Sequence, residues 1–599
     1  NYWPVMHNPR YHLSFLVRRD VIELPTCFTC IPCVFAVCSR FTNSMNIACE
    51  INGIGAMKSA RGMNGHCGMN NARVMLSEGM DEMKLSTHSE LQEAWHDGHG
   101  LQNNLFYNLT KLKLVNCDIT PYAIPSNILP CLKSLKELEV QSCKKVKVVF
   151  AKNDTEEIPT KLNNLTLGNL SELTLLWEKN FQGILKFQNL QQISVNDCKN
   201  IQTLFPDILA ENLTMLEKLE VKSCDGLREI VGKEDVTTCS GKKFSFPHLT
   251  SIHLDTLPEL TYFYHDIFTV EFPVLNDLYV TECPNLELFQ GADPEREAAS
   301  TSTSINRQPL IPNLKAISIL KELSLDWRHI SMLMLGQHFE DLKYLNKSSL
   351  FFNFDKSKKP TLTLEILEMM PNLQDISLGL INSLEIFLTT HNRKQGILRQ
   401  LKILTLYKVF ELQYINLEDS LLNTVCEKLE VLNVLNCLDL NMLFHSPSVL
   451  SFSCMKELKI GYCSGLRYLF KCSMAKVLTC LEEISIMECH SIIEIVAKEQ
   501  DGTTSQGVKF EWLRCIILSS LPSLECFCSG NGSMMLPSLI QVSIWQCPKV
   551  EVFSLGEINA ELFRGIKTSS DSNDQLVFYN DLNASVKRVF LLQVRISSK

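Results

Sequence analysis

A short phrase recurs along most of this chain, and it restricts the possible fold more than any other feature. Its clearest copy begins at Leu216 as LEKLEVKSCDGLREIV and reads L-x-x-L-x-V-x-x-C-x-x-L, a leucine-rich repeat with cysteine where many such repeats carry asparagine. Within it, Leu219 and Val221 alternate with charged residues, which is the period of a strand buried on one face. One unit cannot bury that face alone, so neighbouring units must stack.

Copies of the phrase predict the whole architecture. We count about fifteen units, spaced by about 26 to 33 residues where they are most regular, and interpret residues 330–370 as irregular. The units begin at Leu109, Leu135, Leu162, Leu190, Leu216, Leu249, Leu275, Leu320, Leu373, Leu401, Leu429, Met455, Leu481, Leu513 and Leu539. They predict an α/β solenoid: a leucine-rich-repeat horseshoe with a parallel β-sheet on the concave face and irregular or short helical returns on the convex face.

The two halves of the repeat region match each other. Leu216 and Leu481 are 265 positions apart and begin the similar texts LEKLEVKSCDGLREIVGKED and LEEISIMECHSIIEIVAKEQ, and both longer units that follow carry insertions at the same place. An internal duplication explains this pattern. We therefore expect five regions: non-repeat residues 1–82 that are disordered or not native, a first arc over 83–290, a polar loop over 291–312, a second arc over 313–556 and a tail over 557–599.

Motifs for bound metals or phosphates are incomplete. Cys27, Cys30, Cys33 and Cys38 have the spacing C-x2-C-x2-C-x4-C, but neither a second ligand pair nor a periodic scaffold accompanies them. His96, Asp97 and His99 lack further nearby ligands and are expected to be solvated. In the segment 53–59, Met57 stands where a phosphate loop needs glycine before its lysine. We predict no metal and no cofactor; ATP or ADP enters only if a nucleotide-binding domain lies outside this chain.

Composition and motifs also limit the function. The 57 Lys and Arg against 66 Asp and Glu give a net charge of -9 without a basic run, which disfavours nucleic acid. No uncharged apolar stretch reaches about 18 residues, so no membrane span is expected. HExxH and GxSxG motifs are absent from the sequence, and no motif brings a pair of carboxylates into one pocket. The chain is therefore predicted not to be an enzyme.

Nine cysteines occupy the same place in their repeats, just after the strand. We predict that they form a structural ladder of small buried residues beneath successive turns, kept as thiols in a reducing compartment. They are Cys117, Cys143, Cys198, Cys224, Cys283, Cys437, Cys463, Cys489 and Cys547.

Strand positions that alternate with the buried ones are predicted to face the concave surface and to bind a partner. Among them, Tyr279, Tyr407, Tyr462 and Trp545 are the preferred anchors, because tyrosine and tryptophan are enriched in binding hot spots. Equally, each aromatic residue could serve only cross-strand packing, and the alternating charges of the first arc could be a solvated face. The full set is Glu220, Lys222, Asp277, Tyr279, Thr405, Tyr407, Lys459, Tyr462, Glu483, Met487, Ser543 and Trp545.

Over about residues 83–590 the chain resembles the leucine-rich-repeat region of plant disease resistance proteins of the coiled-coil, nucleotide-binding type. The resemblance rests on L-E-x-L-x-V-x-x-C phrases alternating with F-P-x-L-x-x-I-x-L-x-x-L-P-x-L, and on the ending FSLGEINAELFRGIKTSSDSNDQLVFYNDLN. It implies the sensor arm of a cytoplasmic immune receptor, which in some cases is nuclear or membrane-associated and which binds a pathogen effector or a guarded host protein. The sequence departs from the family in having no phosphate loop and no coiled-coil heptads, which argues against ATP switching by this chain alone.

A second interpretation is the substrate receptor of an F-box-type ubiquitin ligase, because F-box proteins also use cysteine-bearing leucine-rich repeats. Residues 1–100 contain no F-box-like helical segment. The sequence does not identify the ligand or the oligomeric state.

Overall fold

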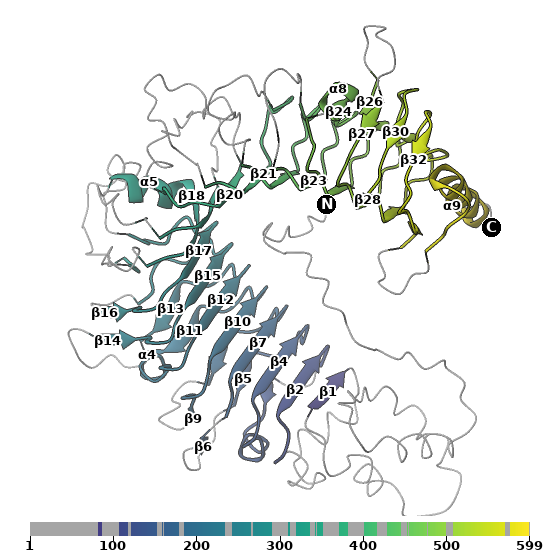
Figure 1. Ribbon diagram of the computed structural model, residues 1–599. Helices are drawn as coiled ribbons and strands as arrows, with labels where there is room; N and C mark the ends of the chain where they lie inside the picture. The colour runs from purple at the N-terminus through teal and green to yellow at the C-terminus, as the bar shows by residue number, and fades with distance from the viewer. Residues whose placement is uncertain are drawn as a thin grey trace, which may run out of the picture.

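The computed structural model is an arc of stacked strands that runs from β1 to the helix α9 (Figure 1). It describes residues 82–86, 107–117, 121–151, 158–159, 161–178, 185–233, 242–264, 268–289, 309–311, 319–335, 342, 344–351, 370–380, 400–415, 428–444, 452, 454–475, 477–498, 507–569 and 576–597. The cysteines of residues 1–82 and the group His96, Asp97 and His99 lie outside these ranges. Within them, no helix is long and apolar enough to cross a membrane.

One 18-stranded sheet forms the inner face of the arc, and each strand pairs in parallel with the strand of the next repeat. This confirms the predicted horseshoe. The strands in spatial order are β1 (Glu82–Ser86), β2 (Lys111–Val115), β4 (Glu137–Gln141), β7 (Asn164–Gly168), β10 (Gln192–Asn196), β12 (Lys218–Lys222), β15 (Ser251–Asp255), β17 (Asp277–Thr281), β18 (Glu322–Asp326), β19 (Lys347–Phe351), β20 (Asp375–Gly379), β21 (Ile403–Tyr407), β22 (Val431–Leu435), β23 (Glu457–Gly461), β25 (Glu483–Met487), β28 (Cys515–Ser519), β31 (Gln541–Trp545) and β33 (Gly565–Lys567).

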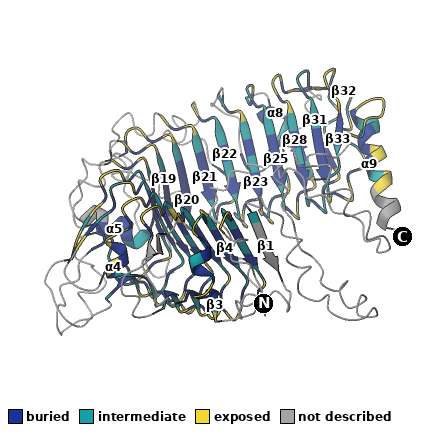
Figure 2. Ribbon diagram, turned by 90° about the horizontal axis from the view of Figure 1, so that it is seen from below, coloured by how far each residue is buried: buried dark blue, intermediate teal, exposed yellow. Residues whose placement is uncertain are grey.

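Alternation along each inner strand places its apolar residues in one continuous core. In β12, Leu219 and Val221 are buried, and the register sets Leu219 between Ile193 of β10 and Ile252 of β15. Figure 2 shows this buried band running along the strands. Each fully buried leucine contributes about 1.5–3 kcal/mol, so stability is built repeat by repeat.

A tight turn with a buried cysteine follows half of the 18 inner strands. Ser142 after β4 has a φ of 55°, and its N–H donates to the carbonyl of Gly168 at 2.9 Å, which ties the turn to the next repeat. Cys143 then points inward, and its thiol donates to the carbonyl of Gln141 at 3.3 Å. All nine cysteines of the predicted ladder are buried, with exposed fractions from 0% to 6%.

The returns on the outer side are short strands and a few helices. Strands that follow the turns at the ends of inner strands are β3 (Tyr122–Ile124), β5 (Val148–Phe150), β8 (Leu175–Trp177), β11 (Thr203–Pro206), β13 (Glu229–Gly232), β24 (Phe470–Lys471), β26 (Glu494–Ala497) and β29 (Cys526–Cys528). Other return strands are β6 (Ile158–Pro159), β9 (Leu185–Lys186), β14 (Lys242–Ser245), β16 (Phe268–Glu271), β27 (Val508–Lys509), β30 (Met534–Met535) and β32 (Ile558–Asn559). The helices are η3 (Leu129–Cys131), α4 (Asp207–Ala210), α5 (Trp327–Leu335), α8 (Cys472–Ala475) and α9 (Leu582–Ser597).

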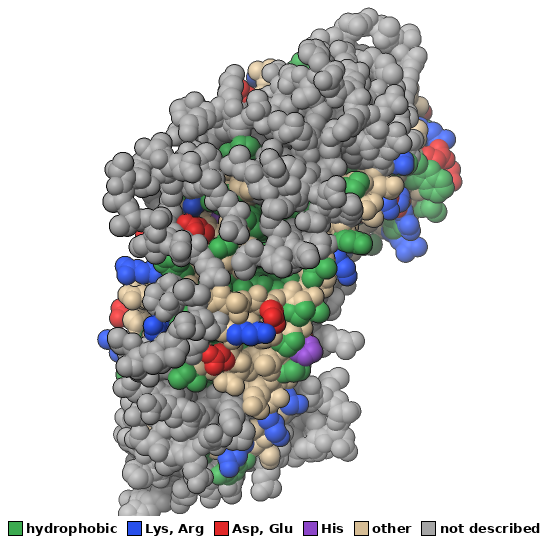
Figure 3. All heavy atoms as spheres, turned by 90° about the vertical axis from the view of Figure 1, so that its left-hand side faces the viewer, with side chains coloured by type: hydrophobic (Ala, Val, Ile, Leu, Met, Phe, Trp, Pro, Cys, Tyr) green, Lys and Arg blue, Asp and Glu red, His purple; other side chains and the backbone are tan. Residues whose placement is uncertain are grey.

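The internal duplication is visible in these returns. Helix α4 precedes β12 and β13, and helix α8 precedes β25 and β26, at equivalent places of the two halves. On the outer side of the bend, shown in Figure 3, described Lys and Arg side chains are interspersed with Asp and Glu.

The segment interpreted as irregular contains a regular strand of the inner sheet, β19. Ser348 occupies the position where other repeats have a buried leucine, and it is fully buried with an unbonded hydroxyl. Because serine is not apolar, the hydrophobic pattern of the sequence did not predict this unit. The sheet also continues past residue 556 to β33, and α9 covers its end with the buried residues Leu582, Val586 and Val589.

Candidate functional site

The concave face is built from the first, third and fifth residues of the inner strands. Because the parallel register pairs equal positions, these residues form three rows that cross the strands around the arc. Charged side chains dominate the rows on the first strands, short hydroxylated side chains fill the third row at the middle of the arc, and apolar side chains fill much of the fifth row in the second half. Each part can therefore be described by the side chains that neighbouring strands place side by side.

The first strands present lysine and glutamate in pairs. Lys113 Nζ lies 2.6 Å from Glu139 Oε1, and Lys111 Nζ lies 3.3 Å from Glu137 Oε2. These side chains are 23% to 46% exposed, so each pair contributes little to stability on its own.

A tighter group lies on β12. Glu220 accepts from Lys218 at 2.7 Å and also contacts Lys222, and its side chain is only 14% exposed. Burial alone would raise the pKa of Glu220, but the hydrogen bonds and charges of the two lysines lower that pKa to about 2. Glu220 and Lys222, both predicted binding residues, therefore partner each other.

At the middle of the arc, short hydroxylated side chains occupy the third row, while the first row still carries charges such as Glu322 and Lys347, 3.5 Å apart. The third row reads Ser324, Ser349, Ser377 and Thr405 over β18 to β21, and all four are buried between their neighbours. Thr405 was a predicted contact residue, but only 5% of it is accessible, and its hydroxyl accepts from Asn433 Nδ2 at 3.0 Å.

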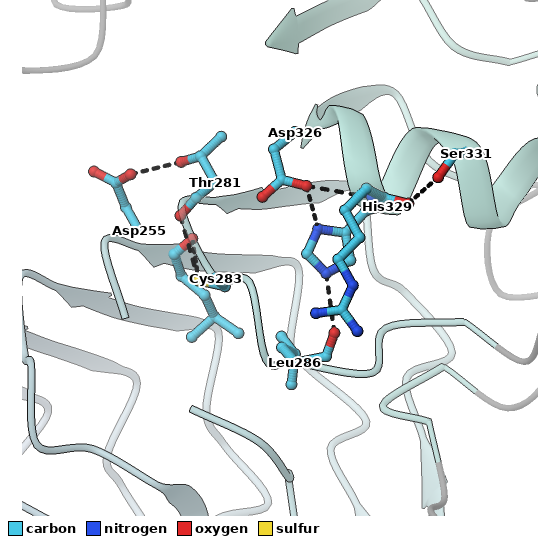
Figure 4. Close-up of polar contacts among 9 residues, drawn as sticks. Asp255, Thr281, Cys283, Leu286, Asp326, His329 and Ser331 are labelled. Carbon is cyan, nitrogen blue, oxygen red and sulfur yellow. Dashed lines mark hydrogen bonds and ion pairs between the residues drawn. The ribbon is translucent and has the colours of Figure 1, made fainter. Parts of the chain in front are cut away.

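Helix α5 holds the middle of the arc to the preceding repeat through a buried histidine (Figure 4). Nδ1 of His329 lies 2.7 Å from Asp326 Oδ1, and Nε2 lies 3.1 Å from the carbonyl oxygen of Leu286. A carbonyl only accepts, so Nε2 carries a proton. Burial would raise the pKa of Asp326, but the hydrogen bond and charge of His329 lower it, so the carboxylate stays ionised and Nδ1 donates to it.

Cys283 belongs to the same neighbourhood, and the three side-chain types could suggest a nucleophilic triad. The thiol of Cys283 instead faces the carbonyls of Thr281 and Leu254, and burial and the charge of Asp326 raise its pKa well above the ordinary value. Both ring nitrogens of His329 are already engaged. This group is therefore a structural tie between repeats. Within the described ranges, no cluster of three or more His, Cys, Asp or Glu side chains could hold a metal.

The second half of the concave face is apolar along its fifth row. The register places Tyr407, Leu435, Gly461 and Met487 side by side on β21, β22, β23 and β25. A Cβ atom on Gly461 would lie 3.0 Å from Leu435 Cδ2 and 3.2 Å from Met487 Cγ. The two side chains thus lean over the glycine, which is buried, from either side.

The turns at the end of these strands extend the apolar surface onto the rim. Phe410, Leu438 and Tyr462 are 43%, 55% and 42% exposed. Phe410 and Leu438 occupy equal places in adjacent turns, and the N–H of Tyr462 donates to the carbonyl of Met487 at 3.0 Å. We define the apolar patch as Tyr407, Phe410, Leu435, Leu438, Tyr462 and Met487. Several exposed or partly exposed apolar side chains gathered on neighbouring strands and turns of a folded protein are typical of an interaction site.

Three of the predicted anchors are accessible. Tyr407 is partly exposed on β21, and Trp545 is partly exposed on β31, two strands beyond β25. Tyr462 lies in the turn after β23 rather than on the strand, with a φ of 57°. Whether any of them binds a partner stays a prediction.

Tyr279 requires a correction, because it is only 7% exposed. Its ring centroid lies 3.9 Å from that of His253, and its hydroxyl contacts Glu322. These neighbours on both adjacent strands make it a packed residue, as the alternative interpretation of the aromatic positions expected.

The remaining predicted residues lie in different surroundings. Ser543 is 4% exposed and accepts from Gln541 Nε2 at 3.2 Å, and Asp277 is partly exposed on β17. Lys459 Nζ lies 2.6 Å from Glu457 and 3.9 Å from Glu483. Burial raises the pKa of Glu483, and Lys459 opposes that effect.

Sequence analysis missed Phe410, Leu435 and Leu438. Leucines in the repeat were read as core, yet Leu435 is the fifth residue of its strand, and Leu438 follows the buried Cys437. The available signal was the position of each residue within the repeat, since a leucine outside the alternating pattern faces solvent.

Comparison with known proteins identifies the type of repeat. Residues 79–225 and 445–556 match the sequence profile of the family described as "Plant disease resistance protein RPS2-like, leucine-rich repeats". Two Arabidopsis thaliana proteins described as disease resistance proteins are 31% and 30% identical over 182 and 122 residues, which are 30% and 20% of this chain. Those matches span only 14% and 12% of the two relatives.

Among solved structures, a leucine-rich-repeat protein of Leptospira interrogans aligns with 80% of this chain and 95% of its own, at 14% identity and a TM-score of 0.29. The sequence matches show that residues 79–225 and 445–556 are similar to leucine-rich repeats of the plant disease resistance type.

Proposed function

We propose that this chain, whose repeats are similar to those of plant disease resistance proteins, is the recognition region of an intracellular plant immune receptor. It binds a pathogen effector or a guarded host protein, and the concave face of its second half makes the main contact. The chain itself is non-catalytic and cytoplasmic in this proposal, and any ATP or ADP is bound by a domain outside it.

The observation that carries this proposal is the apolar patch. Its side chains stand on adjacent parallel strands and their turns, so a partner meets a surface whose backbone is already ordered. Binding to such a surface loses little conformational entropy. Tyr407 and Tyr462 add aromatic rings with a polar end, which is the composition enriched in binding hot spots.

The F-box alternative gains no support from the comparisons, because the matched proteins and family are described as disease resistance proteins. The proposal is tested by screening the full chain against pathogen effectors and host proteins, and by measuring each interaction with Leu435→Asp. We expect the partner to bind the wild-type chain and to lose at least about tenfold in affinity for the variant, because a hot-spot residue contributes about 2 kcal/mol or more.

Leu555→Asp is the matched control for this substitution. Leu555 is 60% exposed beside the return strand β29, away from the concave face. Its replacement by aspartate introduces the same charge as Leu435→Asp. A partner that binds both variants as well as the wild-type chain would contradict the assignment of the patch.

A further inference from the structure

The first half of the concave face contains a hollow that the apolar patch does not include. Its third row reads Glu139, Thr166, Ser194 and Glu220 on β4, β7, β10 and β12, so two short side chains lie between two long ones. The result is a depression of about 170 Å³, which we call the polar trough; it is defined by this row together with Lys111, Glu137, Asn164, Gln192 and Lys218.

The floor of the polar trough has unused hydrogen-bonding groups. Asn164, Thr166, Gln192 and Ser194 are exposed or partly exposed, and none of their side chains bonds to another residue of the described ranges. They offer two amides and two hydroxyls without a net charge. Such groups suit the polar atoms of a peptide backbone, which both donates and accepts.

The two ends of the trough differ in charge. At the β4 end, the carboxylates of Glu82, Glu137 and Glu139 surround the ammonium groups of Lys111 and Lys113, which leaves one negative charge in excess. At the β12 end, Lys218 and Lys222 both contact the carboxylate of Glu220, and Lys218 is the more exposed of the two lysines, at 37% against 16%. On the following strand, β15, the carboxylate of Asp255 accepts a hydrogen bond from the hydroxyl of Thr281 at 2.6 Å.

We propose that the polar trough binds an extended peptide segment of the partner that crosses the strands, with a basic side chain at Glu137 and Glu139 and an acidic side chain at Lys218. The inference rests on the proposed function, because it describes a segment of the recognised protein. Strands β4 and β12 are three spacings apart, about 14 Å, and an extended peptide covers about 13 Å in four residues. The two charged residues of the ligand are therefore about four positions apart.

Selection from a display library of twelve-residue peptides on the full chain tests this proposal. We expect enriched peptides to carry a basic and an acidic residue about four positions apart. Thr166→Arg fills the hollow from its floor and should reduce their affinity at least about fivefold. Ser171→Arg adds the same charge on the exposed turn after β7 and should leave the affinity unchanged. Equal unfolding midpoints of the two variants confirm that the fold is intact.

Charge exchange provides the second readout. Replacing the basic residue of an enriched peptide with glutamate should weaken binding about fivefold, and Glu137→Lys should restore it, since partly exposed ion pairs contribute up to about 1 kcal/mol. Failure to enrich any peptide, enrichment of uniformly acidic or uniformly basic peptides, or equal binding to Thr166→Arg and Ser171→Arg would each overturn the proposal. The apolar patch is tested separately by Leu435→Asp, so a failure of the trough leaves the proposed function standing, and the reverse also holds.

Discussion

Leu435 and Met487 both reach into the space above Gly461, the residue between them in the register, because that glycine has no side chain. Leu435 Cδ2 and Met487 Cγ lie 3.0 and 3.2 Å from the position of a Cβ atom on that glycine. The side chains of β22 and β25 thus approach each other over β23. A glycine in the middle of a sheet, ordinarily unfavourable for strand stability, is here what leaves room for both side chains.

Gly461→Ala tests this relationship directly. The added methyl group must displace Leu435 or Met487, and we expect a loss of up to about 1 kcal/mol in the free energy of unfolding, with weaker partner binding. Gly168→Ala is the control at the same strand position of β7, where the nearest atom, Gln141 Cγ, is 3.6 Å away. That variant should be neutral or slightly more stable, because alanine reduces the entropy of the unfolded chain. Urea unfolding of both variants measures the difference, and equal losses would count against the packing described.

Glu220 should make stability depend on pH in acid solution. Its pKa of about 2 in the folded chain is below the ordinary value of about 4.3, so its stabilising effect is complete above about pH 4.5 and disappears as pH falls toward 2. At pH 7 we expect the free energy of unfolding of Glu220→Gln to be about 2 kcal/mol lower than that of the wild-type chain. This difference should disappear near pH 2. Glu137→Gln, at a side chain 46% exposed, should show a smaller gap. A gap for Glu220→Gln that does not change between pH 7 and pH 2 would show that the lysines do not hold this carboxylate.

His329 should be the most sensitive histidine among the described residues. His329→Ala removes the partner of Asp326 and leaves a carboxylate only 13% exposed, so we expect a loss of about 3 kcal/mol or more. His490→Ala is the control, because His490 is 60% exposed and lies 3.6 Å from Glu488 at the surface, where an ion pair has little effect. Calorimetric unfolding of the two variants should separate them clearly. Similar unfolding temperatures would show that the tie through α5 is not important for stability.

Ladder cysteines should resist alkylation while the chain is folded. Cys547 is 1% exposed and burial raises its pKa to about 11, whereas Cys480 is partly exposed. Iodoacetamide at pH 8 should therefore label Cys480 first and Cys547 only after unfolding, because the thiolate is the reactive form. Peptide mass spectrometry reports each cysteine separately. Comparable labelling rates in the native chain would contradict the buried ladder.

Regular features of the fold could be predicted from sequence because they repeat. The alternation around Leu219 indicated which face of the strand is buried. The constant place of the cysteines in the repeat indicated the turn beneath which they are buried. Strand β19 was not predicted, because Ser348 stands in place of the leucine that defines a unit. A hydrophobic pattern cannot detect a buried serine.

The candidate site was less predictable, because exposure on the concave face depends on neighbours in space. Tyr279 has the same place in its strand as Thr166, yet it is buried by His253 and contacts Glu322 of the next repeat. Leu435 lies on the exposed row although leucine usually marks the core. Neither outcome follows from one repeat alone, since each requires knowing which residues lie on the two adjacent strands.

The central claim is that the apolar patch is where a protein partner binds. Its most direct test is the calorimetric dissociation constant of the first partner found by screening, measured for the wild-type chain, for Leu435→Asp with Met487→Asp, and for Leu555→Asp. We predict that the double variant binds at least about a hundredfold more weakly, because two neighbouring hot-spot residues are lost, while Leu555→Asp binds like the wild type. Unchanged affinity of a correctly folded double variant would contradict the claim.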